Sequence, residues 1–207
     1  MTSAFTFARA LVPALAVVAL AGPSLASPAS DLRAVESHLA QTQSLVSQFT
    51  QTDGKGRQLT GILSMKRPGR IRFEYGRGAN MLLVGNGKTL TFVDYSVRQV
   101  SQWPVKSTPL GILLASEPDL SRVAKVVAAD GNGVIVEARD PKRPEFGTLQ
   151  IAFSRNASAP GGLALEGWAA LDAQGGRTET RLSGATYNAD LSRADFGFKD
   201  PRRAVTR

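Results

Sequence analysis

The chain of 207 residues contains no cysteine and only one histidine, His38. The absence of cysteine excludes disulfides, thiolate nucleophiles and the thiolate ligands of zinc or iron–sulfur sites. His38 stands beside Val35 and Leu39 in a helical pattern, where a lone histidine more often packs than catalyses. From these residue types we predict no catalytic residue, no metal and no cofactor.

Short motifs for nucleophilic or phosphate chemistry are also missing. The sequence has no G-x-S-x-G elbow. Asn86-Gly87-Lys88-Thr89 looks like the end of a phosphate-binding loop, but Leu82 occupies the position of the earlier glycine that such a loop requires. Two carboxylates brought together by folding would escape this search, so an exported carboxylate-based hydrolase stays open as an alternative.

Residues 1–26 have the pattern of a secretory signal peptide. A short segment with Arg9 precedes an apolar run over residues 10–21, and a small-x-small cleavage pattern ends at Ala26. The run is shorter and richer in alanine than a membrane-spanning helix requires. We expect cleavage near Ala26 and an exported chain, residues 27–207, that forms a single domain of sufficient size for a core.

Basic residues outnumber acidic ones. The chain has 25 Lys and Arg against 17 Asp and Glu, a net charge of +8, and loss of Arg9 with the signal peptide lowers it to +7. An exported basic protein is attracted to anionic lipid surfaces or acidic partners. Nucleic acid is not an expected partner, because the charges are scattered and export removes the usual target. A role in solubility alone stays open.

The beginning of the exported chain is predicted to be helical. Apolar residues recur at three- and four-residue spacing up to Leu39, and Ser30 precedes them as an N-cap, with Asp31 in the first turn. This pattern predicts a helix over residues 30–43.

After that helix the apolar period changes from 3.6 to 2, and turn sequences such as Asn86-Gly87 recur. Such short connections force antiparallel neighbours. So many strands in one domain predict a mainly β protein with a large curved sheet or an open barrel. The predicted strands are Leu45–Thr52, Leu59–Lys66, Arg70–Tyr75, Met81–Val84, Thr89–Val93, Arg98–Trp103, Val123–Ala128, Val134–Arg139, Thr148–Phe153, Leu163–Leu171 and Thr178–Tyr187.

One segment, residues 106–123, interrupts the strands. It opens a short helical piece at Thr108-Pro109 and is apolar nearly all round, so it must be covered on most sides. A concave apolar face of a curved sheet needs a cover, and this piece and the N-terminal helix are the only candidates.

The stretch LSMKRPGRIRFEY raises a question about Arg67. Strand side chains alternate between faces, so Arg67 projects on the same side as Leu63 and Met65. A guanidinium is costly to bury without partners. The simplest explanation is an arginine that reaches water past its neighbours at the end of a strand.

Several of these stretches resemble one family. FTQTDGKGRQLTGILSMKRPGRIRFEY, the hairpin LLVGNGKTLTFVD and the segment TPLGILL are similar, in this order, to the LolA-type outer-membrane lipoprotein carriers. The similarity runs from about Asp31 to Leu114 and continues more weakly through RTETRLSGATYNADLSRADFGF. It implies an incomplete, half-open antiparallel β-barrel whose concave hydrophobic face is covered by a helical lid.

The resemblance also implies a function without catalysis. A periplasmic carrier of this family holds the acyl chains of lipoproteins in a hydrophobic cavity. It takes them from an inner-membrane lipoprotein-releasing ABC transporter to an outer-membrane receptor or to the outer membrane itself. We expect a monomer with acylated lipoproteins as cargo. A periplasmic module on the same fold that senses lipids or lipoproteins is the second alternative.

Roles for individual residues follow from the same resemblance. The family's arginine before a proline matches Arg67, which implies a latch that hydrogen-bonds the lid over residues 108–114 in the closed state. The lid segment comprises Pro109, Leu110, Ile112, Leu113 and Leu114. The residues expected to line the acyl-chain cavity are Leu39, Phe49, Leu63, Met65, Ile71, Phe73, Leu90 and Phe92. The same residues would serve equally well as a filled core plugged by the helices.

Overall fold

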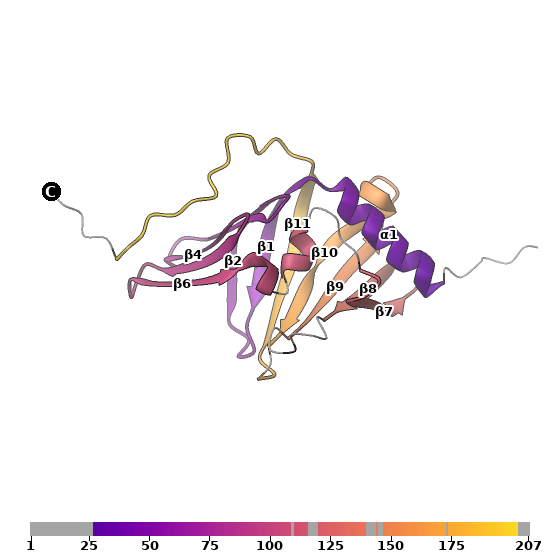
Figure 1. The fold of residues 1–207 in the computed structure, drawn as a ribbon, viewed down its shortest axis with the longest axis horizontal. Helices are drawn as coiled ribbons and strands as arrows, with labels where there is room; N and C mark the ends of the chain where they lie inside the picture. The colour runs from indigo at the N-terminus through magenta and orange to yellow at the C-terminus, as the bar shows by residue number, and fades with distance from the viewer. Residues whose placement is uncertain are drawn as a thin grey trace, which may run out of the picture.

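The fold was analysed in a computed structural model, which describes residues 27–108, 110–115, 120–139, 144, 147–172 and 174–202. The predicted signal peptide, residues 1–26, lies outside them, as does Pro109 of the predicted lid segment. The described residues form one strongly curved sheet with helical segments on its concave side (Figure 1). None of the described helices is long and apolar enough to cross a membrane.

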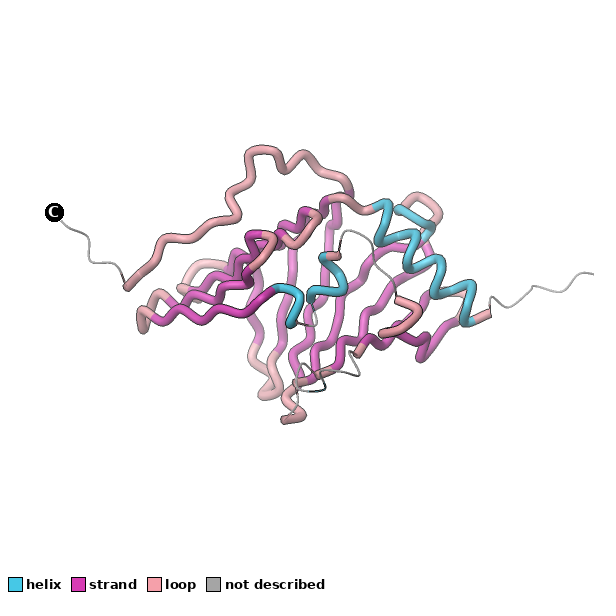
Figure 2. The backbone as a smooth tube through the Cα atoms, viewed as in Figure 1, coloured by secondary structure: helices cyan, strands magenta, loops and turns pink. Residues whose placement is uncertain are grey.

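The sheet has eleven strands in the order β6-β5-β4-β3-β2-β1-β11-β10-β9-β8-β7. Every pair is antiparallel. The pairing of β1 with β11 joins the N-terminal strands, β1 to β6, to the C-terminal strands, β7 to β11. β6 and β7 remain as separate edges, so the sheet is an open barrel, as predicted, and Figure 2 shows its strands as a single bent layer. The strands are β1 (Ser44–Thr52), β2 (Gln58–Lys66), β3 (Arg70–Tyr75), β4 (Met81–Asn86), β5 (Thr89–Asp94), β6 (Gln99–Pro104), β7 (Ala124–Ala129), β8 (Gly133–Ala138), β9 (Thr148–Arg155), β10 (Leu163–Leu171) and β11 (Arg177–Tyr187).

All predicted strands are confirmed, with ends shifted by two residues at most. The N-terminal helix differs more: α1 spans Pro28–Gln41, so its expected start and end were each placed two residues too late. Ser27, not Ser30, is the N-cap, and its hydroxyl accepts a hydrogen bond from the Ser30 amide at 3.3 Å. Proline suits the first helical position because it lacks the N–H group that would be unpaired there. Pro28 therefore lets the helix start closer to the N-terminus than expected.

The other helical segments are short. η1 (Val105–Ser107) and α2 (Leu110–Leu114) follow β6, and η3 (Pro160–Gly162) connects β9 to β10. α2 confirms the helical piece predicted between the strands, although it is only five residues long. α1 packs on η3, β7 and β10, whereas α2 follows η1 in the middle of the concave side (Figure 1).

Alternation of side chains along the strands produces two apolar clusters. The larger lies between the concave face and the helices and includes residues from both halves of the sheet. The smaller lies on the convex face, where Leu82, Val84 and Val93 are covered by Phe196 and Phe198 of the C-terminal segment. The Arg72 guanidinium also donates to the Gly197 carbonyl at 3.0 Å, which holds this segment against the sheet.

Candidate functional site

The concave face has two halves that differ in how they are covered. The covered half is the concave side of β7 to β10, beneath α1. Its side chains are almost inaccessible to water: the exposed fractions of Val136, Leu149 and Ile151 are all 0%. Val35 and Leu39 of α1 complete this packing from above. The covered half is therefore a filled core.

The open half is the concave side of β3 to β6. Residues directly opposite each other in an antiparallel sheet share a face, so Phe73, Leu83 and Phe92 form one inward row across β3, β4 and β5. Phe73 is buried, but Leu83 and Phe92 are only half-buried. In the next row Leu90 is opposite Trp103, which is 46% exposed. Apolar surface thus becomes progressively more accessible toward β6.

An aromatic group separates the two halves. The Phe49 ring meets Phe73 edge-to-face at 5.1 Å and Tyr75 at 5.3 Å, and Trp168 meets Phe73 at 6.1 Å. Gly61 lies beneath Phe49, and a Cβ there would be 2.8 Å from the Phe49 ring and 2.1 Å from the Glu74 carbonyl oxygen. Glycine is therefore required for the ring to lie on the strand.

The predicted cavity residues are brought together. Leu39, Phe49, Leu63, Met65, Ile71, Phe73 and Leu90 all belong to the large concave cluster, and each is at most 5% exposed. In this closed arrangement they pack against one another and against the helices. Phe92 projects from the same face of β5 but is half-buried and lies outside that cluster.

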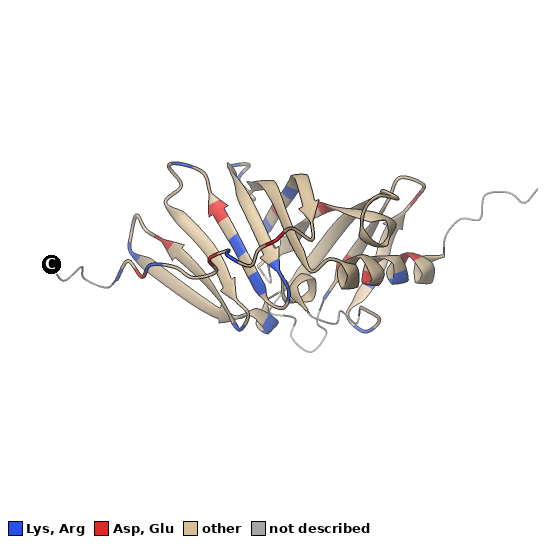
Figure 3. Ribbon diagram, turned by 90° about the horizontal axis from the view of Figure 1, so that it is seen from above, with Lys and Arg blue, Asp and Glu red and all other residues tan. Residues whose placement is uncertain are grey.

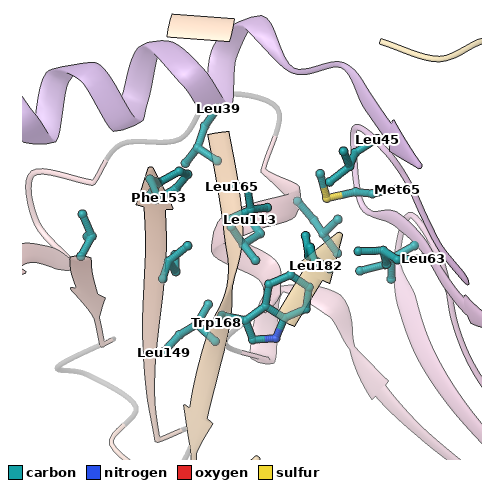
Figure 4. Packing of buried hydrophobic residues seen from close by; sticks show 14 of the residues in the cluster. Leu39, Leu45, Leu63, Met65, Leu113, Leu149, Phe153, Leu165, Trp168 and Leu182 are labelled. Atoms are coloured by element: carbon teal, nitrogen blue, oxygen red, sulfur yellow. The ribbon is translucent and has the colours of Figure 1, made fainter. Parts of the chain in front are cut away.

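The α2 segment is tied to the core and to the neighbouring turn. Leu113 and Leu114 are buried in the concave cluster, and Leu110 and Ile112 pack against it while half-buried. Figure 4 shows Leu113 directed into the same group as Leu165, Trp168 and Leu182. The Leu114 carbonyl accepts a hydrogen bond of 2.9 Å from the amide of Gly69, in the turn between β2 and β3. Leu110, Ile112, Leu113 and Leu114 of the predicted lid segment therefore lie on the concave face, and Pro109 is outside the described residues.

Arg67 has a different hydrogen-bond partner from the one expected. Its side chain is turned inward and the residue is only 7% exposed, so it does not reach water past its neighbours. Its Nη1 donates to the Leu39 carbonyl in the last turn of α1, rather than to the 108–114 segment. Such carbonyls have no partner within the helix, and no sequence signal distinguishes those of α1 from those of α2. Burial lowers the pKa of the Arg67 guanidinium to about 10.

Only some of the hydrogen-bond donors of the Arg67 guanidinium have partners among the described residues. Its Nε and Nη2 atoms are buried and have no hydrogen-bond partner in the described part of the chain. A buried donor without a partner costs free energy comparable to a lost hydrogen bond. The contact with α1 therefore offsets only part of the cost of burying Arg67.

α1 is also held by polar contacts of His38, which precedes Leu39, and of Asp31. The His38 ring lies between Phe153 and Tyr187, with its Nδ1 2.9 Å from the Pro160 carbonyl oxygen of η3. At the other end of the helix, Asp31 forms an ion pair of 2.7 Å with Arg155 of β9. Burial lowers the pKa of His38. His38 thus serves packing, as its position in the sequence indicated.

Sequence reasoning missed the contribution of the C-terminal strands. Phe153, Leu165, Trp168 and Leu182 belong to the concave cluster, but none was predicted to line the cavity. The alternation in β9 and β11 was available as a signal. In β10 the phase changes at a bulge between Leu165 and Gly167, which turns Trp168 inward.

No chemistry other than apolar contact is apparent at this face. Within the part of the chain that the structure describes, no group of three or more His, Asp and Glu side chains is placed to hold a metal ion. Burial raises the pKa of Tyr75 to about 12, and its hydroxyl donates to Gln51 Oε1 at 2.9 Å. A neutral, hydrogen-bonded phenol contributes structure to the face rather than reactivity.

Comparison with known proteins gives consistent matches. The sequence profile of the family described as outer membrane lipoprotein carrier protein LolA matches residues 40–199. An outer-membrane lipoprotein carrier protein from Chromobacterium violaceum is 30% identical over 202 residues, covering 93% of each chain. Another from Azotobacter vinelandii is 30% identical over 175 residues, covering 79% of this chain and 81% of the relative. The crystal structure of a LolA superfamily protein from Nitrosomonas europaea has a TM-score of 0.45 and 10% identity, covering 84% of this chain and 99% of that one.

Proposed function

The chain belongs to the LolA family of outer membrane lipoprotein carrier proteins, and from this premise we propose that it is a periplasmic carrier of acylated lipoproteins. It binds the acyl chains of its cargo on the concave face. It receives them from an inner-membrane lipoprotein-releasing ABC transporter and passes them to the outer membrane or to a receptor there. The protein acts by binding and release rather than by catalysis.

The observation that carries this proposal is the open half. Leu83 and Phe92 are only half-buried, on a face that is continuous with the filled core. An acyl chain laid along this half would cover apolar surface that the protein itself leaves accessible. The covered half offers no such surface, because α1 already fills it. Acyl chains therefore enter from the β6 side of the concave face.

The free energies involved explain the need for an apolar face. Moving one CH₂ group from lipid to water costs about 0.8 kcal/mol, so a chain of sixteen carbons costs roughly 12 kcal/mol. A lipoprotein with several chains cannot cross an aqueous compartment at that cost. The open half lowers the cost without needing chemistry, and its remaining exposure keeps the affinity low enough for release.

The turn between β2 and β3 connects the carrier face to both helices. Arg67 contacts the end of α1, and Gly69, two residues later, contacts the end of α2. Cargo that lifts α2 would break the Gly69 bond and displace the turn that positions Arg67. Among the described residues the guanidinium has one hydrogen bond to lose, and release would expose its two unpaired donors to water, which lowers the cost of release. In this revised form, Arg67 is a latch on α1 that responds to α2.

Cargo binding is testable by native mass spectrometry of the purified protein mixed with a triacylated lipopeptide. We expect one lipopeptide per chain. Phe92→Asp places a charge on the open half and should reduce binding at least tenfold, since a carboxylate there would lose its hydration against an acyl chain. Ile62→Asp is the matched control, because Ile62 of β2 is 45% exposed and alternates with the inward Gly61 and Leu63.

Two results would overturn the proposal. The first is a wild-type protein that takes up no lipopeptide at concentrations where the lipopeptide is dispersed. The second is an equal loss of binding in Phe92→Asp and Ile62→Asp, because it would place the acyl chains elsewhere than on the concave face.

A further inference from the structure

A row of cations, three of them exposed and one (Lys66) half-buried, follows one edge of the molecule. The basic edge consists of Lys66, Arg70, Lys88 and Lys106, and it runs along the ends of β2 to β6 that lie beside η1. Lys66 is opposite Arg70 across β2 and β3, and Arg70 is opposite Asn86 across β3 and β4. The positions are therefore neighbours in the sheet although the sequence separates them.

Backbone hydrogen bonds extend this row to η1. The Asn86 side chain accepts bonds from the amide of Lys88 at 3.0 Å and from that of Thr89, which fixes the hairpin between β4 and β5. The Val105 amide then donates to the Lys88 carbonyl at 2.8 Å, which places Lys106 beside Lys88. The connections are local and rigid, so the cations are presented together.

The cations of the basic edge are little compensated by nearby carboxylates. Among the described residues, only Lys66 has a carboxylate close enough for its charge to act on: the pKa of Asp190 is lowered first by hydrogen bonds from Ser192 and then by the charge of Lys66. None of its four side chains takes part in an ion pair with a carboxylate of the described residues, whereas Arg72 in the middle of β3 pairs with Glu74. Lys66 donates to the Leu191 carbonyl at 3.4 Å. Figure 3 shows Lys and Arg positions at strand ends and along neighbouring strands of this half of the sheet.

Trp103 adds an apolar element to the same edge. It is the last residue but one of β6, three residues before Lys106, and is 46% exposed, while its strand partner Leu90 belongs to the concave core. Tryptophan concentrates at the interface between bilayer and water, and clustered Lys and Arg are attracted to anionic headgroups. An exposed tryptophan beside cations that form no salt bridge with the described residues is therefore better suited to contact with a lipid surface than to contact with water alone.

We infer that the basic edge docks on the surface of a bilayer that contains anionic phospholipids, with Trp103 entering the headgroup region. Docking in this orientation turns the β6 side of the open half toward the membrane. The inference deepens the proposed carrier function by naming a partner, but it concerns the protein without cargo. Its failure is therefore distinguishable from a failure to bind lipopeptide.

The experiment uses the cargo-free full exported chain and vesicles of phosphatidylglycerol and phosphatidylcholine, with pure phosphatidylcholine for comparison. The test variant carries Arg70→Gln, Lys88→Gln and Lys106→Gln. The control carries Lys55→Gln, Arg77→Gln and Arg98→Gln, three exposed cations in the turns at the opposite ends of the same strands. Both variants lose the same net charge, and all six changes are at exposed side chains, so folding is retained.

We expect co-sedimentation with the anionic vesicles that weakens as salt rises. Each Lys or Arg near an anionic surface contributes about 1 kcal/mol, so the test variant should bind about a hundredfold more weakly. The control variant should lose much less, because its charges face away from the bilayer. Brominated lipid should also quench the fluorescence of Trp103 and spare Trp168, which is 6% exposed.

Equal losses in the two variants would overturn the inference, because only net charge would then matter. Absence of binding by the wild-type chain to anionic vesicles at low salt would overturn it as well, and would leave the basic edge to an acidic protein partner. Equal binding to pure phosphatidylcholine would overturn the electrostatic argument.

Discussion

The two halves of the sheet differ in which of their faces are fully covered. β7 to β10 bury their concave face under α1, and they leave Ile135 on the convex face 38% exposed. β4 and β5 bury their convex face, where the C-terminal segment covers Leu82, Val84 and Val93, and on the concave side they bury Leu90 but leave Leu83 and Phe92 half-buried. The accessible apolar side chains therefore lie on the convex face in the covered half and on the concave face in the open half.

This difference explains how a binding face can remain open in a stable protein. A strand needs at least one well-packed face. For β4 and β5 this is the convex face, which packs against the C-terminal segment. The concave side of these strands is then free for a ligand without loss of the fold. In the covered half the concave side carries the stability itself, so a ligand there would compete with α1.

The largest expected contrast is in stability. Ile151→Ala removes a fully buried side chain from the covered half and should lower the free energy of unfolding by about 2–5 kcal/mol. Leu83→Ala in the open half should cost about 1 kcal/mol, because Leu83 already contacts water. Urea unfolding with unchanged m-values measures both. Similar costs for the two changes would show that the halves are packed alike.

A second, smaller effect tests the C-terminal cover. Phe198→Ala should lower the free energy of unfolding by about 2 kcal/mol, less than for a fully buried phenylalanine because Phe198 is only half-buried. Lipopeptide binding should stay unchanged, since the concave face keeps its side chains. Val97→Ala, at a residue 67% exposed, is the control and should change stability by less than about 0.5 kcal/mol. Loss of lipopeptide binding in Phe198→Ala would mean that the two faces of β4 and β5 are coupled.

The elements of the fold could be predicted because their signals are local. Alternation of apolar and polar residues and turn sequences such as Asn86-Gly87 placed every strand within two residues. The proline at position 28 was a local signal too, and it was not used. The bulge before Gly167 was less visible, because the register change depends on β9 and β11 as neighbours. A Cβ at Gly167 would be 2.1 Å from the Thr180 carbonyl oxygen, a constraint that only the assembled sheet reveals.

The contacts of the site could be predicted only in part. The phase of β2 correctly placed Arg67 on the inward side, but its hydrogen bond to Leu39 depends on where α1 ends in space. Likewise, nothing near Asp31 in the sequence indicates its ion pair with Arg155, 124 residues away. Which half of the concave face is filled follows from such distant pairs, because they decide where α1 lies.

The smallest effect, and the most selective for the covered half, is acid sensitivity at His38. Its ring is buried between Phe153 and Tyr187, and burial lowers its pKa below the ordinary value of 6.5. The unfolded chain therefore takes up a proton near pH 6.5 that the folded chain still excludes. The free energy of unfolding should fall as the pH drops below about 6.5, by at most about 1.4 kcal/mol per pH unit.

His38→Phe removes this titration while keeping an aromatic ring beside Phe153 and Tyr187, so its stability should be flatter between pH 6.5 and 5. Carboxylates such as Glu137 and Glu179, whose pKa values are lowered by hydrogen bonds and charges, lose their contributions only at more acidic pH. Hydrogen exchange at pH 5.5 should accelerate in α1 and η3 before β4 and β5. Protonation of His38 disfavours its burial between the two rings, so α1 should loosen first where it contacts η3. Equal acceleration in both halves would instead mean that α1 and the open half unfold as one unit, and that the two halves are not independent.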